Sequence, residues 1–137
     1  MMFAIAAIVL AQATAAPAQP MDMDKPIAFG KLEIACSGVG SAKDDPQWGA
    51  YPIRIEFANG AAQNLSGAHI TITSGGSTVA DGVCWGPWLL VRGAPGSYHV
   101  NATIDGSHTT AASNFTVGNG TRQTRVVLRF PDFQANE

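Results

Sequence analysis

The histidines and one aspartate are the residues of this sequence that are best suited to acid–base chemistry. A hydrolase needs a base that is held beside a nucleophile or an orienting partner, and only His69, His99 and Asp105 come near such a set. His69 and His99 share the polar parity of their predicted strands with Thr71 and Asn101, so we expect both rings to face solvent. The sequence therefore predicts no catalytic residue and no cofactor, and we expect a protein that is not an enzyme.

A second possible chemistry is metal binding by the run Met21 to Asp24, which reads Met-Asp-Met-Asp. Thioethers are soft ligands that bind copper(I) in exported proteins, whereas two methionines make a small ligand set. We therefore expect a polar linker here and predict no metal site. A periplasmic protein that binds copper or a small ligand remains the alternative.

The third possibility is a binding surface in the long polar segment from Gly38 to Ala50. Asp44 and Asp45 lie in this segment without the regular ligand spacing of a calcium loop. Trp48 follows them, and an aromatic ring in an exposed loop offers a large contact area. We take Trp48, Asp44 and Asp45 as the candidate binding residues, with packing of the loop as the alternative role for Trp48.

The chain has two cysteines, Cys36 and Cys84. In an oxidising compartment such a pair is expected to form a disulfide. Two separate buried thiols, each acting as a small apolar residue, are the alternative.

The start of the chain predicts export. Residues 1–18 contain an apolar run followed by small residues, with small-x-small patterns at residues 13–15 and 16–18, as in a signal peptide. The run is too short for a stable membrane span, which needs about 20 residues. We expect a periplasmic or secreted protein with a signal peptide (1–18), a flexible arm (19–28), one β-sandwich domain (29–131) and a C-terminal tail (132–137).

The composition excludes some partners. Charged residues make up 13% of the chain, and eight lysines and arginines stand against ten acidic residues, so no basic surface for nucleic acid is predicted. We instead interpret three arginines near the C-terminus as a solvated strand face with an edge charge that discourages pairing with another strand. They are Arg122, Arg125 and Arg129. The expected partner is another exported or envelope protein, reached through a sheet edge or the Gly38 to Ala50 segment; the oligomeric state is left open.

Alternation of apolar and polar residues organises the rest of the chain. It is clearest from Tyr51 to Phe57 and recurs from Ala68 to Thr73, and turn signals follow at intervals of about ten residues. The run from Gly86 to Ala102 predicts a β-hairpin turning at Pro95-Gly96. The expected fold is an all-β, antiparallel, two-sheet Greek-key sandwich of seven or eight strands.

Four segments carry a resemblance to a known family: Gly38-Val39-Gly40, the strand from Tyr51 to Ala58, the run Gly86 to Val91, and Pro95-Gly96-Ser97-Tyr98-His99-Val100. At these residues the chain resembles the exported carboxypeptidase regulatory-like domain proteins of bacteria. The resemblance implies a transthyretin-like (prealbumin-like) sandwich and offers no catalytic residues to carry over to this chain. It implies no peptidase activity, because the zinc-binding catalytic domain of those carboxypeptidases lies outside this module.

Overall fold

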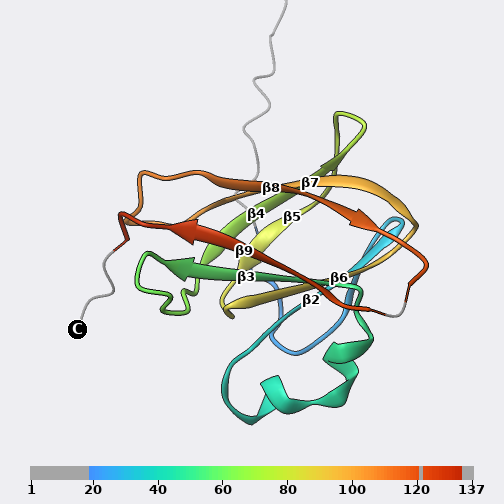
Figure 1. Cartoon of the computed structure of the whole chain (residues 1–137), viewed down its shortest axis with the longest axis horizontal. Coiled ribbons are helices and arrows are strands. Elements are labelled where there is room, and N and C mark those ends of the chain that lie inside the picture. Colours follow the sequence, from blue (N-terminus) through green and yellow to red (C-terminus); the bar gives the residue numbers. More distant parts are fainter. Residues whose placement is uncertain (1–18, 121, 134–137) are drawn as a thin grey trace, which may run out of the picture.

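Two β-sheets pack face to face in the protein (Figure 1). The computed structural model describes residues 19–120 and 122–133, which form nine strands and two short 3-10 helices. One sheet has five strands in the order β1-β2-β6-β3-β9 and the other has four in the order β5-β4-β7-β8. The strands are β1 (Ile27–Phe29), β2 (Leu32–Ser37), β3 (Ile53–Asn59), β4 (Ala68–Ser74), β5 (Ser77–Cys84), β6 (Trp88–Gly93), β7 (Gly96–Thr103), β8 (Ala111–Val117) and β9 (Thr124–Phe130). The predicted all-β sandwich is confirmed.

Strand pairing departs from the prediction in two respects. The described chain has nine strands rather than seven or eight, because β1 is only three residues long and is too short to show a periodic pattern. The five-stranded sheet is also mixed, since β3 and β9 run parallel, with Ile53 opposite Thr124 and Asn59 opposite Phe130. All other strand pairs in the two sheets are antiparallel.

The core lies between the sheets and is formed by alternate residues of each strand. In β7 the side chains of Tyr98, Val100 and Ala102 are buried, whereas Ser97 before them and Thr103 after them are exposed. The same parity holds in β3, where Ile53, Ile55 and Phe57 are buried. Burial of each large apolar side chain contributes roughly 1.5–3 kcal/mol, so this alternation specifies which face of each strand turns inward.

The hairpin predicted from Gly86 to Ala102 is wrong in its pairing. β6 pairs with β2 and β3, whereas β7 pairs with β4 and β8, so the Pro95-Gly96 turn carries the chain from one sheet to the other. The Tyr98 hydroxyl donates a hydrogen bond of 2.7 Å to the carbonyl of Ala94 and fixes this corner. A turn signal identifies the reversal but not the sheet that the next strand joins, which explains the error.

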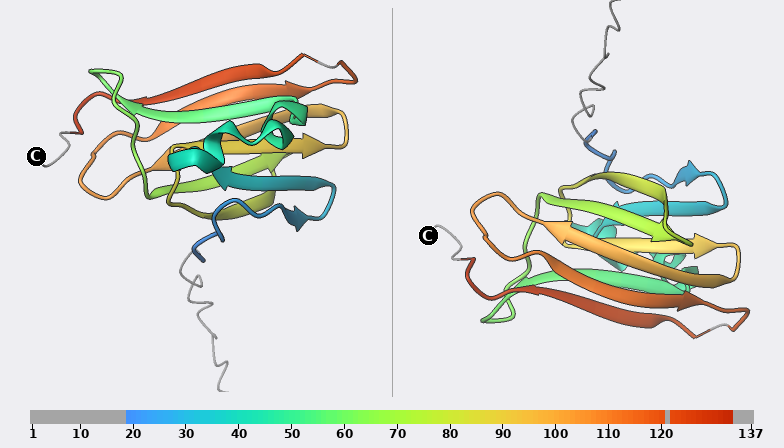
Figure 2. Two further views of the ribbon diagram at one scale, coloured as in Figure 1. Left: turned by 90° about the horizontal axis from the view of Figure 1, so that it is seen from below. Right: turned by 90° about the horizontal axis from the view of Figure 1, so that it is seen from above.

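The segment after β2 folds as two short 3-10 helices, η1 (Gly40–Asp44) and η2 (Pro46–Ala50). They lie over the outer face of the five-stranded sheet (Figure 2, left). Asp45 caps η2, because its carboxylate accepts hydrogen bonds from the backbone N–H and the side-chain amide of Gln47. These bonds lower the pKa of Asp45 below its usual value, the backbone bond contributing most.

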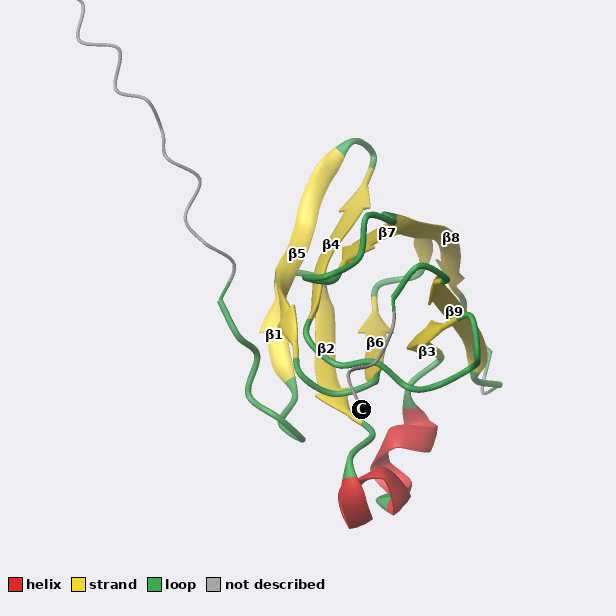
Figure 3. Ribbon diagram, turned by 90° about the vertical axis from the view of Figure 1, so that its left-hand side faces the viewer, coloured by secondary structure: helices red, strands yellow, loops and turns green. Residues whose placement is uncertain are grey.

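The arm predicted at residues 19–28 does not extend away from the domain. Residues 19–24, called the strap from here on, lie along β5 and β2, and residues 27–29 form β1 (Figure 3). The backbone of Met21 donates to Val83, and that of Asp24 donates to Cys36. At the other end, Asp132 and Phe133 of the predicted tail pack against the β7–β8 connection. The predicted signal peptide, 1–18, lies outside the described residues.

Candidate binding surface on the four-stranded sheet

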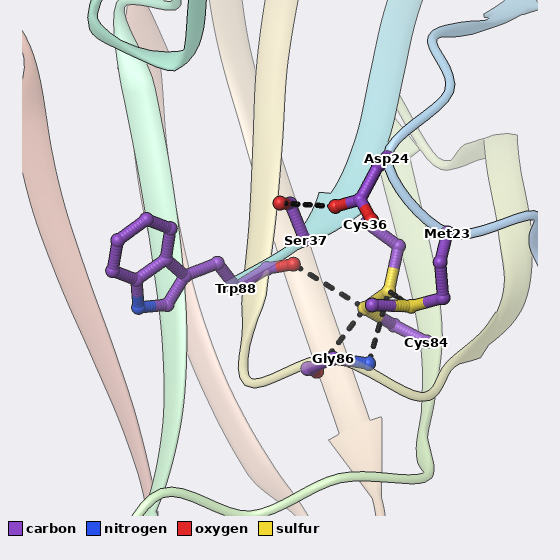
Figure 4. The surroundings of a disulfide bond; sticks show 7 residues. All are labelled: Met23, Asp24, Cys36, Ser37, Cys84, Gly86 and Trp88. Atoms are coloured by element: carbon purple, nitrogen blue, oxygen red, sulfur yellow. Dashed lines mark hydrogen bonds between the residues drawn. A yellow bond between two sulfur atoms is a disulfide. The ribbon is translucent and has the colours of Figure 1, made fainter. Parts of the chain in front are cut away.

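The Cys36–Cys84 disulfide is formed and links β2 of one sheet to β5 of the other. Both cysteines are fully buried, and the N–H of Gly86 donates to the sulfur of Cys36 over 3.2 Å (Figure 4). The sulfur of Met23 lies 3.5 Å from that of Cys36, a sulfur–sulfur contact because a disulfide carries no proton. The predicted disulfide is therefore confirmed, and the strap covers it.

This placement bears on the alternative in which the Met21 to Asp24 run binds copper. Met21 is only 6% exposed and belongs to the core, and Met23 packs against the disulfide. Both thioethers point into the sandwich because burial of an apolar side chain has a lower free energy than its exposure to water. In the part of the chain that the structure describes, no group of three or more histidine, cysteine, aspartate or glutamate side chains is placed to hold a metal ion.

Of the two roles considered for Trp48, an exposed contact and packing of the loop, the structure shows the second. It is 3% exposed and packs with Ala35, Tyr51 and Leu90 between η2 and the five-stranded sheet. Its indole N–H donates to the carbonyl of Ala42 over 2.8 Å, which meets the polar requirement of a buried tryptophan. The ring therefore holds the Gly38 to Ala50 segment on the sheet and is unavailable to a ligand.

The other two candidate residues of that segment, Asp44 and Asp45, are exposed. Asp45 caps η2, as described above, so it has a structural role. The structure does not bring Trp48, Asp44 and Asp45 together as one contact surface. The exposed tryptophan is instead Trp85, at 57%, between β5 and β6. Strand parity could have identified it, since the preceding residue is the buried Cys84.

The histidines lie where the strand parity predicted. His69 is exposed and His99 is half-buried, both on the outer face of the four-stranded sheet. His69 lies opposite Thr103 and His99 opposite Thr73, so the two rings are four residues apart along the strands. No hydrogen bond or ion pair among the described contacts connects either ring with Asp105.

This outer face extends over three adjacent strands, β4, β7 and β8 (Figure 2, right). β4, β7 and β8 contain no aspartate, glutamate, lysine or arginine. Apart from Ala112, their outward residues bear hydroxyl, amide and imidazole groups, which both donate and accept hydrogen bonds. The polar ones are His69, Thr71, Thr73, Ser97, His99, Asn101, Thr103, Asn114 and Thr116.

His99 connects these side chains across two strands. Its Nδ1 lies 2.7 Å from the amide oxygen of Asn114 in β8, and its Nε2 lies 3.2 Å from that of Asn101. Both distances are of hydrogen-bond length; because an amide oxygen only accepts and a neutral imidazole has one N–H, the ring donates to one of the two oxygens. His99 therefore lies between Asn101 and Asn114 at the centre of the polar face.

A hollow of about 370 Å³ opens on this face at the foot of the β4–β5 turn. Gly75 and Gly76 of the turn form one wall, and residues of β7 and β8, including His99, Asn114 and Thr116, form the other. A smaller hollow of about 90 Å³ lies between His69 and Asn101. The larger hollow is wide enough for a side chain and reaches β8, the edge strand.

The edges of the two sheets differ in their protection against pairing with another chain. β1 is three residues long, β9 carries Arg125 and Arg129, and β5 carries Asp81 and is hydrogen-bonded to the strap at Val83. β8 has seven residues, Ala111–Val117, with neither a charged side chain nor a proline. Unpaired backbone groups of such a strand are a template for a further strand. β8, which lies beside β9 of the other sheet, is thus the edge strand that has none of these protections.

The chain matches no family model and no curated protein sequence. Within the described residues, no helix has the length and apolar character that crossing a membrane requires.

Proposed function

We propose that the protein is a non-catalytic exported module that binds another exported or envelope protein by pairing β8 with an extended segment of that partner. The observation that carries the proposal is the unprotected edge of β8, with the 370 Å³ hollow beside it. In strand addition, main-chain hydrogen bonds supply affinity and pockets for alternate side chains supply specificity. The two features needed for this mode of binding lie together on the same edge.

The chemistry of the surface defines the segment that fits it. The outward side chains of β7 and β8 are uncharged, so a lysine, arginine, aspartate or glutamate of the partner would lose hydration there without gaining an ion pair. An extended segment with small or uncharged polar side chains can bond to the hydroxyl and amide groups that line the hollow. We infer that the partner presents such a segment.

Export is part of the same proposal. The buried disulfide agrees with an oxidising compartment, and the signal peptide predicted at residues 1–18 would deliver the chain there. The resemblance to carboxypeptidase regulatory-like domain proteins favours the same location, periplasmic or secreted. A binding module of the cell envelope is the role that unites these features.

The test begins with a photo-crosslinking amino acid placed at Ala112 of β8 in intact cells. The matched position is Thr78, which is exposed on the same outer face but on the opposite edge strand, β5. We expect one exported protein to be captured at position 112 and not at position 78. That protein is then purified and titrated against the wild type and against two lysine variants.

The variant Ala112→Lys/Thr116→Lys adds two charges to the open edge, and Thr78→Lys adds one to the control edge. We expect the first to weaken binding at least about tenfold, because edge lysines oppose strand pairing, and the second to leave affinity unchanged. Unaltered affinity of the first variant would contradict the proposal. Capture of only a second copy of this chain at position 112 would also contradict it, since β8 would then be a homodimer interface.

A further inference from the structure

We propose that the strap, residues 19–24, exchanges between two copies of the chain and gives a dimer in which each strap lies in the other copy's groove. The groove lies between β5 and β2, on the side of the sandwich opposite to β8 and β9 (Figure 3). This inference does not depend on the proposed partner of β8, because the two surfaces share no residues.

The groove is built to receive an extended segment. Val83 of β5 accepts from the N–H of Met21 and donates to the carbonyl of Gln19, each over 2.9 Å. Cys36 of β2 accepts from the N–H of Asp24 over 2.8 Å. The strap thus forms backbone hydrogen bonds with one strand of each sheet. A second copy of the chain has the same backbone groups at these positions.

Gly82 leaves space in the groove for a methionine. A side-chain carbon at Gly82 would lie 2.8 Å from the terminal methyl of Met21, which is shorter than a carbon–carbon contact allows. At Gly86 such a carbon would lie 2.3 Å from the carbonyl oxygen of Ser37 and 2.9 Å from the terminal methyl of Met23, so the backbone of β2 requires glycine there as well. The segment known to fit this groove is the strap itself, and a second copy is the molecule that carries another one.

The backbone after the strap provides the hinge. Met23 runs parallel to β2, whereas Ile27 in β1 runs antiparallel to it, so the chain reverses at residues 24–26. Asp24 makes this reversal with a φ of 60°, a left-handed conformation that costs free energy for a residue with a side chain, although aspartate adopts it more readily than most. Pro26 favours an extended conformation of Lys25. An extended hinge would relieve Asp24 and carry the strap to a neighbouring copy.

The contacts of the strap are the same in both arrangements, apart from the hinge. Exchange therefore balances the relief of Asp24 against the entropy lost on association. One contact favours the closed form: the hydroxyl of Ser37 donates to the carboxylate of Asp24 over 2.6 Å. The dimer fraction must consequently rise with protein concentration.

The experiment joins positions that are bridged in the structure. In the variant Pro20→Cys/Val83→Cys, the new cysteines occupy the paired positions of strap and groove. After refolding at increasing concentration, non-reducing electrophoresis shows a disulfide-linked dimer where the straps have exchanged and a monomer where they have not. We expect the dimer fraction to increase with concentration, and either single-cysteine variant to give no linked dimer of this kind.

Two hinge variants form a matched pair, because both lose the bond from Ser37. Asp24→Gly accepts the left-handed conformation without strain, whereas Asp24→Val opposes it. We expect the association constant of Asp24→Val, measured by light scattering after refolding, to exceed that of Asp24→Gly at least about fivefold. Equal constants for the two, or a purely monomeric Pro20→Cys/Val83→Cys protein at every concentration, would overturn the proposal. The β8 variant Ala112→Lys/Thr116→Lys should dimerise as the wild type does.

Discussion

Trp48 and Trp85 illustrate how local packing decides the role of a residue. Trp48 lies in a polar segment and is nevertheless buried, because the carbonyl of Ala42 satisfies its indole N–H. The side-chain amide of Gln123 donates to the carbonyls of Trp48 and Tyr51, which holds η2 against the start of β9. Trp85 lies beside a disulfide cysteine and is nevertheless exposed.

We therefore predict that substitutions of the two tryptophans change the free energy of unfolding by different amounts. Trp48→Ala removes a buried ring and is expected to cost about 3–5 kcal/mol, as measured by urea denaturation. Trp85→Ala, the matched control, is expected to change stability by less than about 1 kcal/mol. A similar loss for both would show that Trp48 does not anchor the 3-10 helices.

The sequence predicted residue positions well where strand parity applies and poorly where it does not. Tyr98, Val100 and Ala102 are buried as expected, and His69 and His99 face outward. The burial of Trp48 was left open between two alternatives because an irregular loop has no period from which burial can be inferred. For the same reason, the hollow beside His99 was not predicted: it depends on how far the β4–β5 turn projects.

At the scale of elements, one aspartate joins the end of β9 to the connection between β7 and β8. Asp132 accepts hydrogen bonds from the hydroxyls of Ser107 and Thr109 and from the N–H of His108, over 2.6–2.7 Å. These bonds stabilise the carboxylate and lower the pKa of Asp132 far below its usual range, with the Ser107 bond contributing most. The contact ties together segments that belong to different sheets.

Because the folded pKa of Asp132 is lower than the unfolded value of about 4, its stabilising effect is present above that pH. It is lost as the pH falls through the folded pKa. We predict that Asp132→Asn lowers Tm near neutral pH and that the difference from the wild type shrinks as the pH is lowered from about 5 to 2. Asp105→Asn, an exposed aspartate of the same connection, is the control. A difference that is independent of pH would contradict the assigned role.

Sequence reasoning at this scale recognised the strands but not all of their partners. β5 continues through Asp81-Gly82, a dipeptide that is typical of turns, and Gly82 leaves room there for Met21 of the strap. β6 and β7 follow one another across a Pro-Gly turn and still belong to different sheets. Pairing depends on contacts between residues that are distant in sequence, and local turn chemistry does not report those contacts.

At the scale of the whole molecule, the disulfide connects the two sheets near their shared edge. Cys36 and Cys84 are 48 positions apart in the sequence, and the segment between them includes β3 and β4, one central strand from each sheet. Closing a loop of this length lowers the entropy of the unfolded chain, which raises its free energy by about 4 kcal/mol at 25 °C in the chain-entropy model. The bond therefore provides a large share of the stability of a small sandwich.

We predict that Cys36→Ala/Cys84→Ala lowers the free energy of unfolding by about 4 kcal/mol, as measured by urea denaturation under oxidising conditions. Alanine avoids placing a polar group in the core. The wild type under a strong reductant should show a similar loss. A double variant as stable as the wild type would mean that packing of the strap and sheets alone fixes the two layers together.

The parallel pair of β3 and β9 has a consequence for how the molecule is made. Glu56 and Arg125, which form an ion pair across these strands, are 69 residues apart in the sequence. The edge strand β9 can therefore join the five-stranded sheet only after nearly the whole chain is available for folding. Long-range pairing of this kind slows folding. A chain threaded across a membrane from its N-terminus would consequently remain pliable during transit and acquire its final shape only on arrival.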